Sequence, residues 1–152
     1  MSGAPAARSV WGTVTPGSSR RREAVPLPWP DAILGVALAG ALGALARYGL
    51  GRALQGLSLE FPWGTFVING IGCLLIAVAG GLALRESPLA PFLRLDVMTG
   101  FIGAFTTFST FNLETVMLAQ ASPRRAALYL LGSTAAGLAA VWLGGVLLGA
   151  LA

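Results

Sequence analysis

Long uncharged stretches are the feature that most constrains this chain. Between charged residues the sequence has four apolar stretches, at residues 32–46, 61–84, 97–113 and 126–152. Because about 20 apolar residues cross a bilayer as a helix, the second and fourth are long enough by themselves. The first and third also suffice if Arg47 snorkels to the interface and Glu114 lies near a helix end or faces a protein-lined space. We expect four membrane spans, at roughly Asp31–Leu54, Pro62–Leu84, Leu95–Ala119 and Arg124–Leu151.

Composition agrees with lipid as the solvent for most of the surface. Only 11% of the 152 residues are charged, against about a quarter in soluble domains. The chain has no lysine and no histidine, which excludes Schiff-base chemistry, histidine acid–base catalysis and histidine metal sites. We therefore expect no enzyme. The single cysteine, Cys73, lies in an apolar run and is interpreted as a small buried hydrophobe.

The ten arginines and six acids give a net charge of +4, yet the arginines flank apolar runs, which favours a membrane over nucleic acid. Their distribution specifies orientation only weakly. Residues 1–30 are rich in Ser, Pro, Arg and Gly, so we expect a disordered or surface-lying extension. A cleaved twin-arginine signal around Arg20–Arg22 is the alternative. Residues 31–152 then form the transmembrane domain.

The third stretch contains the most unusual sequence, from Gly100 to Asn112. Its glycines, threonines and run of hydroxyl side chains weaken a regular helix and can satisfy freed carbonyls. Such a break within a membrane is tolerated where it lines a cavity or is buried in protein. Phe108 and Phe111 share one helical face, and their weakly positive ring edges suit an anion that has lost water. Packing rings and ordinary interhelical hydrogen bonds are the alternatives.

Other polar side chains interrupt the second and fourth stretches. Asn69 offers two N–H donors without a fixed charge, and joining two helices is an equally good interpretation. Tyr129 and Ser133 lie one turn apart, and Ser133 taken alone favours helix packing. Glu114 marks either ion coupling or a solvated rim position.

Three ordered motifs together resemble the Fluc/CrcB family of fluoride channels. They are the segments 43–48 (GALARY), 62–65 (PWGT) with Asn69-Gly70, and Gly100-Phe101 continuing through 106–111 (TTFSTF). The resemblance covers residues 31–152 and implies an all-α membrane protein of four helices, with the third broken in mid-membrane. It further implies an antiparallel, dual-topology homodimer in the bacterial inner membrane.

The resemblance also implies roles for particular residues. Fluoride would pass out of the cell passively, along pore residues Asn69, Thr107, Phe108, Ser109, Thr110, Phe111, Tyr129 and Ser133. Main-chain carbonyls of Gly103 and Thr106 from both subunits would hold one structural Na⁺ on the two-fold axis. Arg47 and Glu114 match family positions of less certain role. The partners implied are fluoride, a second copy of the chain and lipid.

Two other functions remain open from the sequence. A small proton-coupled exporter of cationic drugs also uses four short spans and dual topology, but it needs a central carboxylate in the first span. The first apolar stretch has none. The other is a scaffold subunit that transports nothing.

Overall fold

The computed structural model describes residues 29–57, 61–85 and 88–150. The predicted N-terminal extension lies almost entirely outside these ranges. Every regular element in the described residues is helical. Three helices are long and apolar enough to cross a membrane: α1 (Trp29–Leu54), α2 (Trp63–Leu84) and α6 (Pro123–Ala150). They match the expected first, second and fourth spans to within two residues at each described end.

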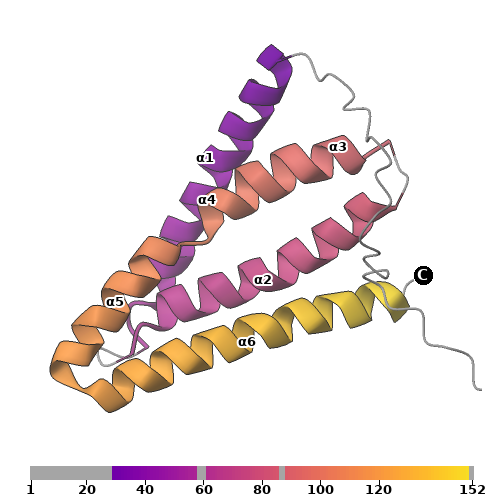
Figure 1. Cartoon of the computed structure of the whole chain (residues 1–152). Helices are drawn as coiled ribbons and strands as arrows, with labels where there is room; N and C mark the ends of the chain where they lie inside the picture. Colours follow the sequence, from indigo (N-terminus) through magenta and orange to yellow (C-terminus); the bar gives the residue numbers. More distant parts are fainter. Residues whose placement is uncertain (1–28, 58–60, 86–87, 151–152) are drawn as a thin grey trace, which may run out of the picture.

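The third span is a series of shorter elements, as Figure 1 shows. It begins with α3 (Ala90–Phe92), continues as the π-helix η1 (Leu93–Ile102) and α4 (Gly103–Phe105), and resumes as α5 (Phe108–Ala121). The backbone is extended at Thr106 (ψ 160°) and Thr107 (φ −147°), so the helix is broken there. The expected break within 100–112 is confirmed. The π-helical register was not predicted.

The second and fourth spans run side by side over their whole length (Figure 1). Glycine makes this contact close: a Cβ on Gly144 of α6 would lie 2.7 Å from the Ala77 Cβ and 3.1 Å from the Leu74 carbonyl oxygen of α2. At the far end of the pair, the Arg85 guanidinium donates to the Leu148 carbonyl of α6 at 3.2 Å. The two helices therefore form the most extensive packed layer of the structure.

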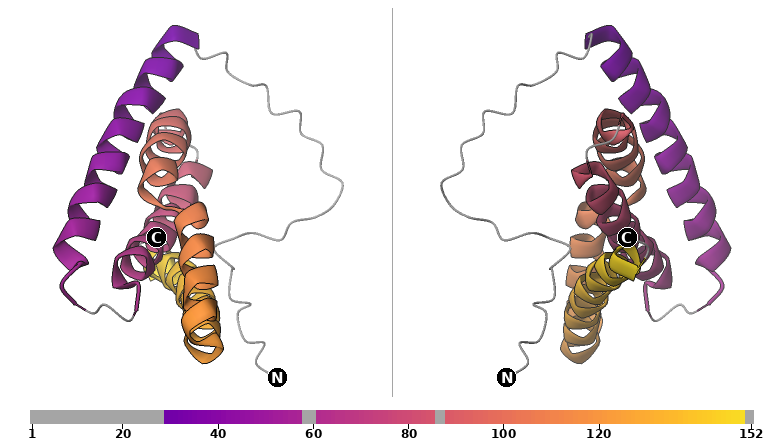
Figure 2. Two further views of the ribbon diagram at one scale, coloured as in Figure 1. Left: turned by 90° about the vertical axis from the view of Figure 1, so that its left-hand side faces the viewer. Right: turned by 90° about the vertical axis from the view of Figure 1, so that its right-hand side faces the viewer.

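Helix α1 packs against the first half of the third span and leans away from α6 (Figure 2). Gly43 of α1 lies against the Phe101 main chain, and a Cβ on Gly100 would lie 3.0 Å from the Val36 carbonyl oxygen. Small residues at helix contacts of this kind allow close backbone approach. Because α1 contacts η1 and α4 rather than α5, the cavity described below opens between α1 and α5.

Candidate functional site

The break in the third span is held by a side chain from another helix. Asn69 of α2 donates from Nδ2 to the Thr107 carbonyl oxygen at 3.1 Å, and its Oδ1 accepts the Thr107 N–H at 2.9 Å. The Asn69 oxygen thus replaces the main-chain acceptor that the Thr107 N–H would have in a continuous helix, and the Asn69 N–H adds a donor to the Thr107 carbonyl. Gly72, one turn further along α2, contacts the Thr106 methyl group where a Cβ would overlap it. The absence of a side chain there brings α2 close to the break.

Hydroxyl groups begin the helix that follows the break. Thr107 is the N-cap of α5, and its Oγ1 accepts the Thr110 N–H at 3.3 Å. The same hydroxyl donates to Thr110 Oγ1 at 2.9 Å and lies 3.4 Å from Ser109 Oγ. Before the break, the Thr106 N–H and hydroxyl both donate to the Ile102 carbonyl at 3.0 Å. The hydroxyl run therefore forms caps within its own segment.

An open groove of about 410 Å³ lies beside the break. Asn69, Thr107, Phe108, Phe111 and Ser133 all line it, so the structure brings five of the eight predicted pore residues together. The Ser133 Oγ is buried without a hydrogen-bond partner, and within the described ranges no other buried side-chain nitrogen or oxygen is in that state. Polar groups buried in proteins normally have partners. The groove therefore contains an unused hydroxyl and the second N–H of the Asn69 amide.

The two phenylalanines differ sharply in exposure. Phe108 is 77% exposed, whereas Phe111 is 9% exposed. Their ring centroids are 6.2 Å apart, and the Phe111 ring lies 5.2 Å from that of Tyr129. One ring is thus fixed in the core, and the other stands at the open side of the groove.

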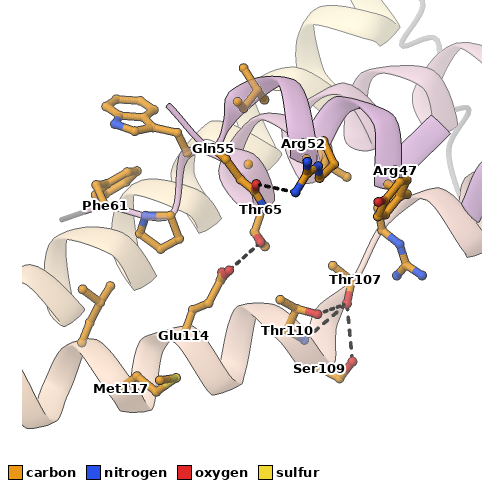
Figure 3. Close-up of a pocket in the computed structure, with 18 of the residues that line it drawn as sticks. Arg47, Arg52, Gln55, Phe61, Thr65, Thr107, Ser109, Thr110, Glu114 and Met117 are labelled. Carbon is orange, nitrogen blue, oxygen red and sulfur yellow. Dashed lines mark hydrogen bonds between the residues drawn. The ribbon is translucent and has the colours of Figure 1, made fainter. Parts of the chain in front are cut away.

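A second cavity, of about 860 Å³, lies between α1 and α5 (Figure 3). We call it the arginine-lined cavity, because Arg47 and Arg52 of α1 line one side of it. Ser109, Thr110 and Glu114 of α5 line the opposite side, and Thr107 lines both this cavity and the groove. The two spaces therefore adjoin at the break.

Glu114 connects three helices at the end of this cavity. Its Oε1 accepts the Thr65 hydroxyl of α2 at 2.9 Å, which Figure 3 shows, and its Oε2 accepts the Tyr129 hydroxyl of α6 at 2.7 Å. Tyr129 is fully buried and lines neither space. Of the predicted pore residues, Tyr129 is thus the one placed behind the groove, as a hydrogen-bond donor to Glu114.

The hydrogen bonds at the break leave the two predicted sodium ligands, the Gly103 and Thr106 carbonyls, without their helical donors. In a continuous α-helix the Gly103 carbonyl would accept the Thr107 N–H, and the Thr106 carbonyl would accept the Thr110 N–H. Here these two amides donate instead to Asn69 Oδ1 and Thr107 Oγ1. Both carbonyls are released from their helical donors, and carbonyl oxygens are the ligands that hard cations accept. The residues present therefore fit such an ion.

Sequence reasoning missed three residues at these sites. Thr65 was not expected to bond Glu114, and Arg52 was assigned only to a membrane flank. Cys73 was interpreted as buried, yet it is half-buried and lines the groove one turn from Asn69. The signal for Cys73 was its spacing of four residues from Asn69 on one helical face.

Comparison with known proteins places these features in a family. The family model described as "CrcB-like protein, Camphor Resistance (CrcB)" matches residues 34–145. A protein of Acidobacterium capsulatum, named fluoride-specific ion channel FluC, is 51% identical over 113 residues, which are 73% of this chain and 90% of the relative. A protein of the same name from Nitratidesulfovibrio vulgaris is 48% identical over 70% of this chain and 88% of its own length. The protein named fluoride-specific ion channel FluC 2 of Symbiobacterium thermophilum is 48% identical over 72% of this chain and 91% of the relative.

Proposed function

Since this chain belongs to the CrcB family, whose relatives carry the name of fluoride-specific ion channels, we propose that it is a fluoride channel. It is a membrane protein, and it lets fluoride leave the cell passively through the bacterial inner membrane. The carrying observation is the groove that gathers Asn69, Ser133 and two phenylalanine rings beside the broken helix. This is not the composition of an enzyme site, and the named relatives are ion channels.

The chemistry of the groove suits a small, strongly hydrated anion. Such an ion crosses only where the pore replaces its water with several donors, and each donor must bind weakly enough to release it. Asn69 offers one unused N–H, Ser133 offers an unpartnered hydroxyl, and the phenylalanine ring edges are weakly positive. None of these groups carries a full positive charge that would trap the anion.

The arginine-lined cavity provides a reason for anions to reach the groove. Arg47 and Arg52 raise the local concentration of anions in a space that ends at Thr107. Glu114, the carboxylate at the same cavity, accepts two neutral hydroxyl donors. In this proposal the anion passes from the arginines to the hydroxyls of Ser109 and Thr110, and then past Thr107 into the groove.

A second copy of the chain completes the pore in this proposal. The groove is open on the side where Phe108 is exposed, and lipid alone offers no hydrogen-bond partner to the polar groups of Asn69 and Ser133 that line it. The copies insert in opposite orientations, because the arginine distribution favours neither one. The Gly103 and Thr106 carbonyls of both subunits would hold one structural Na⁺, which when bound would supply a fixed positive charge near the pore.

Efflux from liposomes tests the fluoride proposal. Vesicles loaded with potassium fluoride and carrying the purified chain should release fluoride when valinomycin balances the charge, with no proton gradient imposed. Vesicles loaded with chloride should retain it. Fluoride release no faster than from protein-free vesicles would refute the channel.

Topology has its own test. A protease-cleavable tag at the C-terminus should be cut in about half of the molecules in sealed vesicles of one orientation. Cleavage that is complete or absent would refute dual topology and leave fluoride conduction to be judged by the efflux assay.

The drug-exporter alternative is not favoured. Such an exporter exchanges protons at a carboxylate in the middle of its first span, whereas Asp31, in the first turn, is the only acid in α1. Transport of a cationic dye that required an opposing proton gradient, with no passive release of fluoride, would favour this alternative instead.

A further inference from the structure

The hydrogen bonds at the break assign Asn69 a second function besides lining the pore. We infer that Asn69 is a positioning residue for the cation site, because it takes the amide that would otherwise occupy the Gly103 carbonyl. The inference rests on the proposed function, since the cation belongs to it. It concerns the cause of the break rather than the path of the anion.

Both ends of the Asn69 amide bond the same residue of the broken helix. Its oxygen accepts the Thr107 N–H at 2.9 Å, and its nitrogen donates to the Thr107 carbonyl at 3.1 Å. A side chain serving only as a pore donor would need one N–H directed at the ion and no fixed contact with the main chain. Here the oxygen and one of the two N–H groups of Asn69 bond a single residue of another helix.

Two main-chain carbonyls lose their amide donors at the break. Each carbonyl in an α-helix accepts the amide four residues later. With the Thr107 amide bonded to Asn69 and the Thr110 amide bonded to the Thr107 hydroxyl, the Gly103 and Thr106 carbonyls lose those donors. These are the two carbonyls assigned to the cation. Two side-chain oxygens, one from α2 and one from the broken segment, therefore release the two main-chain oxygens.

The consequence is a coupling between the groove and the cation site. Without the Asn69 oxygen, the half-buried Thr107 amide loses its acceptor, and an N–H group that is partly shielded from solvent is costly to leave unbonded. Rebonding to the Gly103 carbonyl is the nearest remedy, and it removes that oxygen from the cation. Substitutions at Asn69 should therefore weaken sodium binding as well as fluoride flux.

Three variants separate the two functions of Asn69. Asn69→Leu removes the acceptor and should raise the apparent dissociation constant for Na⁺ at least tenfold. Asn69→Asp retains an acceptor oxygen for the Thr107 amide and should keep its Na⁺ response within about threefold of the original chain. Its fluoride flux should fall, because a carboxylate repels the anion. Thr115→Val is the matched control, because the Thr115 hydroxyl bonds its own helix at the Phe111 carbonyl and lines neither the groove nor the arginine-lined cavity.

The readout is thermal unfolding of the full chain in detergent, titrated with NaCl against KCl at constant ionic strength. A ligand at free concentration L that binds only the folded protein stabilises it by RT ln(1 + L/Kd) and so raises its melting temperature as L exceeds Kd. The titration therefore reports sodium binding without any flux. Asn69→Leu with a sodium response within threefold of the original chain would overturn the inference. So would an original chain that conducts fluoride but melts identically in the two salts, whereas the channel proposal would survive that result.

A measurement on the unmodified chain covers the case in which Asn69→Leu does not fold. Exchange of K⁺ for Na⁺ should shift the ¹³C resonances of the Gly103 and Thr106 carbonyls in the NMR spectrum. The Thr107 amide should exchange slowly with solvent in both salts, because its acceptor is Asn69 rather than the ion site. A Thr107 amide that exchanges as fast as a solvated loop amide would overturn the inference. An inactive chain that passes both tests would refute the channel and leave Asn69 as the positioning residue.

Discussion

Phe108 and Phe111 lie one turn apart, yet their surroundings differ, so we expect the two rings to have different functions. Phe111 is packed against Tyr129 in the core, and Phe108 stands exposed at the groove. A substitution at Phe111 therefore disturbs packing as well as any contact with the anion. Phe108 is the better residue for testing the ring edge by itself.

We predict that Phe108→Ile reduces fluoride flux about tenfold or more, equivalent to about 1.4 kcal/mol in the barrier. Isoleucine fills similar space but lacks the positive ring edge. Fluoride-electrode efflux from liposomes measures the change, and size-exclusion chromatography checks assembly. Phe92→Ile, an exposed phenylalanine outside the groove, should conduct as the original chain does. A loss of assembly in Phe108→Ile would reassign the ring to subunit packing.

Cys73 offers a probe of the groove that requires no added cysteine. It is the only cysteine of the chain and lines the groove beside Gly137. We predict that a small methanethiosulfonate reagent attaches to this thiol and reduces fluoride efflux by at least about half, because the added group fills a narrow conducting space. The Cys73→Ser variant should conduct fluoride at the original rate, and the reagent should leave its efflux unchanged. Labelling confirmed by mass with undiminished efflux would place the ion path elsewhere.

At the scale of helices, the contact between α2 and α6 rests on the absence of side chains. We predict that Gly144→Ala destabilises the chain by about 1–3 kcal/mol, because the new methyl overlaps Ala77 and Leu74. Gly132→Ala in the same helix meets no atom within 4 Å and should be neutral or stabilising by up to about 1 kcal/mol. Denaturant unfolding in detergent micelles compares the pair. Equal free energies of unfolding for the two variants would mean that α2 and α6 can move apart to accommodate the added methyl group without a loss of stability.

Hydropathy predicted the helices well because the number of apolar residues needed to span a bilayer is fixed by its thickness. The break was also predictable, since Thr106 and Thr107 both favour side-chain bonds to the main chain. The π-helical hydrogen bonding of η1 (Leu93–Ile102) was not predictable, because no pattern of side chains distinguishes this segment from an α-helix. The partners of Asn69 and Glu114 were not predictable either, because they lie on other helices: Thr107 is 38 positions from Asn69, and Thr65 and Tyr129 are 49 and 15 positions from Glu114.

For the whole molecule, the matched family region predicts where the function resides. Family similarity covers residues 34–145, and all the proposed pore and sodium residues lie within it. We predict that a variant lacking residues 1–28 retains fluoride efflux within about twofold, since the matched region 34–145 already contains every residue proposed to line the pore or hold sodium. The same electrode assay measures it, with protein content determined in each vesicle preparation. A truncated chain that inserts and assembles but does not conduct would show that the pore needs the extension.

Because Asn69 of α2 bonds the main chain at the break between Thr106 and Thr107, the position of the break depends on α2 as well as on the segment that contains it. Transplanting this segment between homologous genes should give a working hybrid only when the second helix travels with it. The smallest exchangeable module of this protein is therefore the consecutive pair formed by α2 and the broken helix that follows it in the chain.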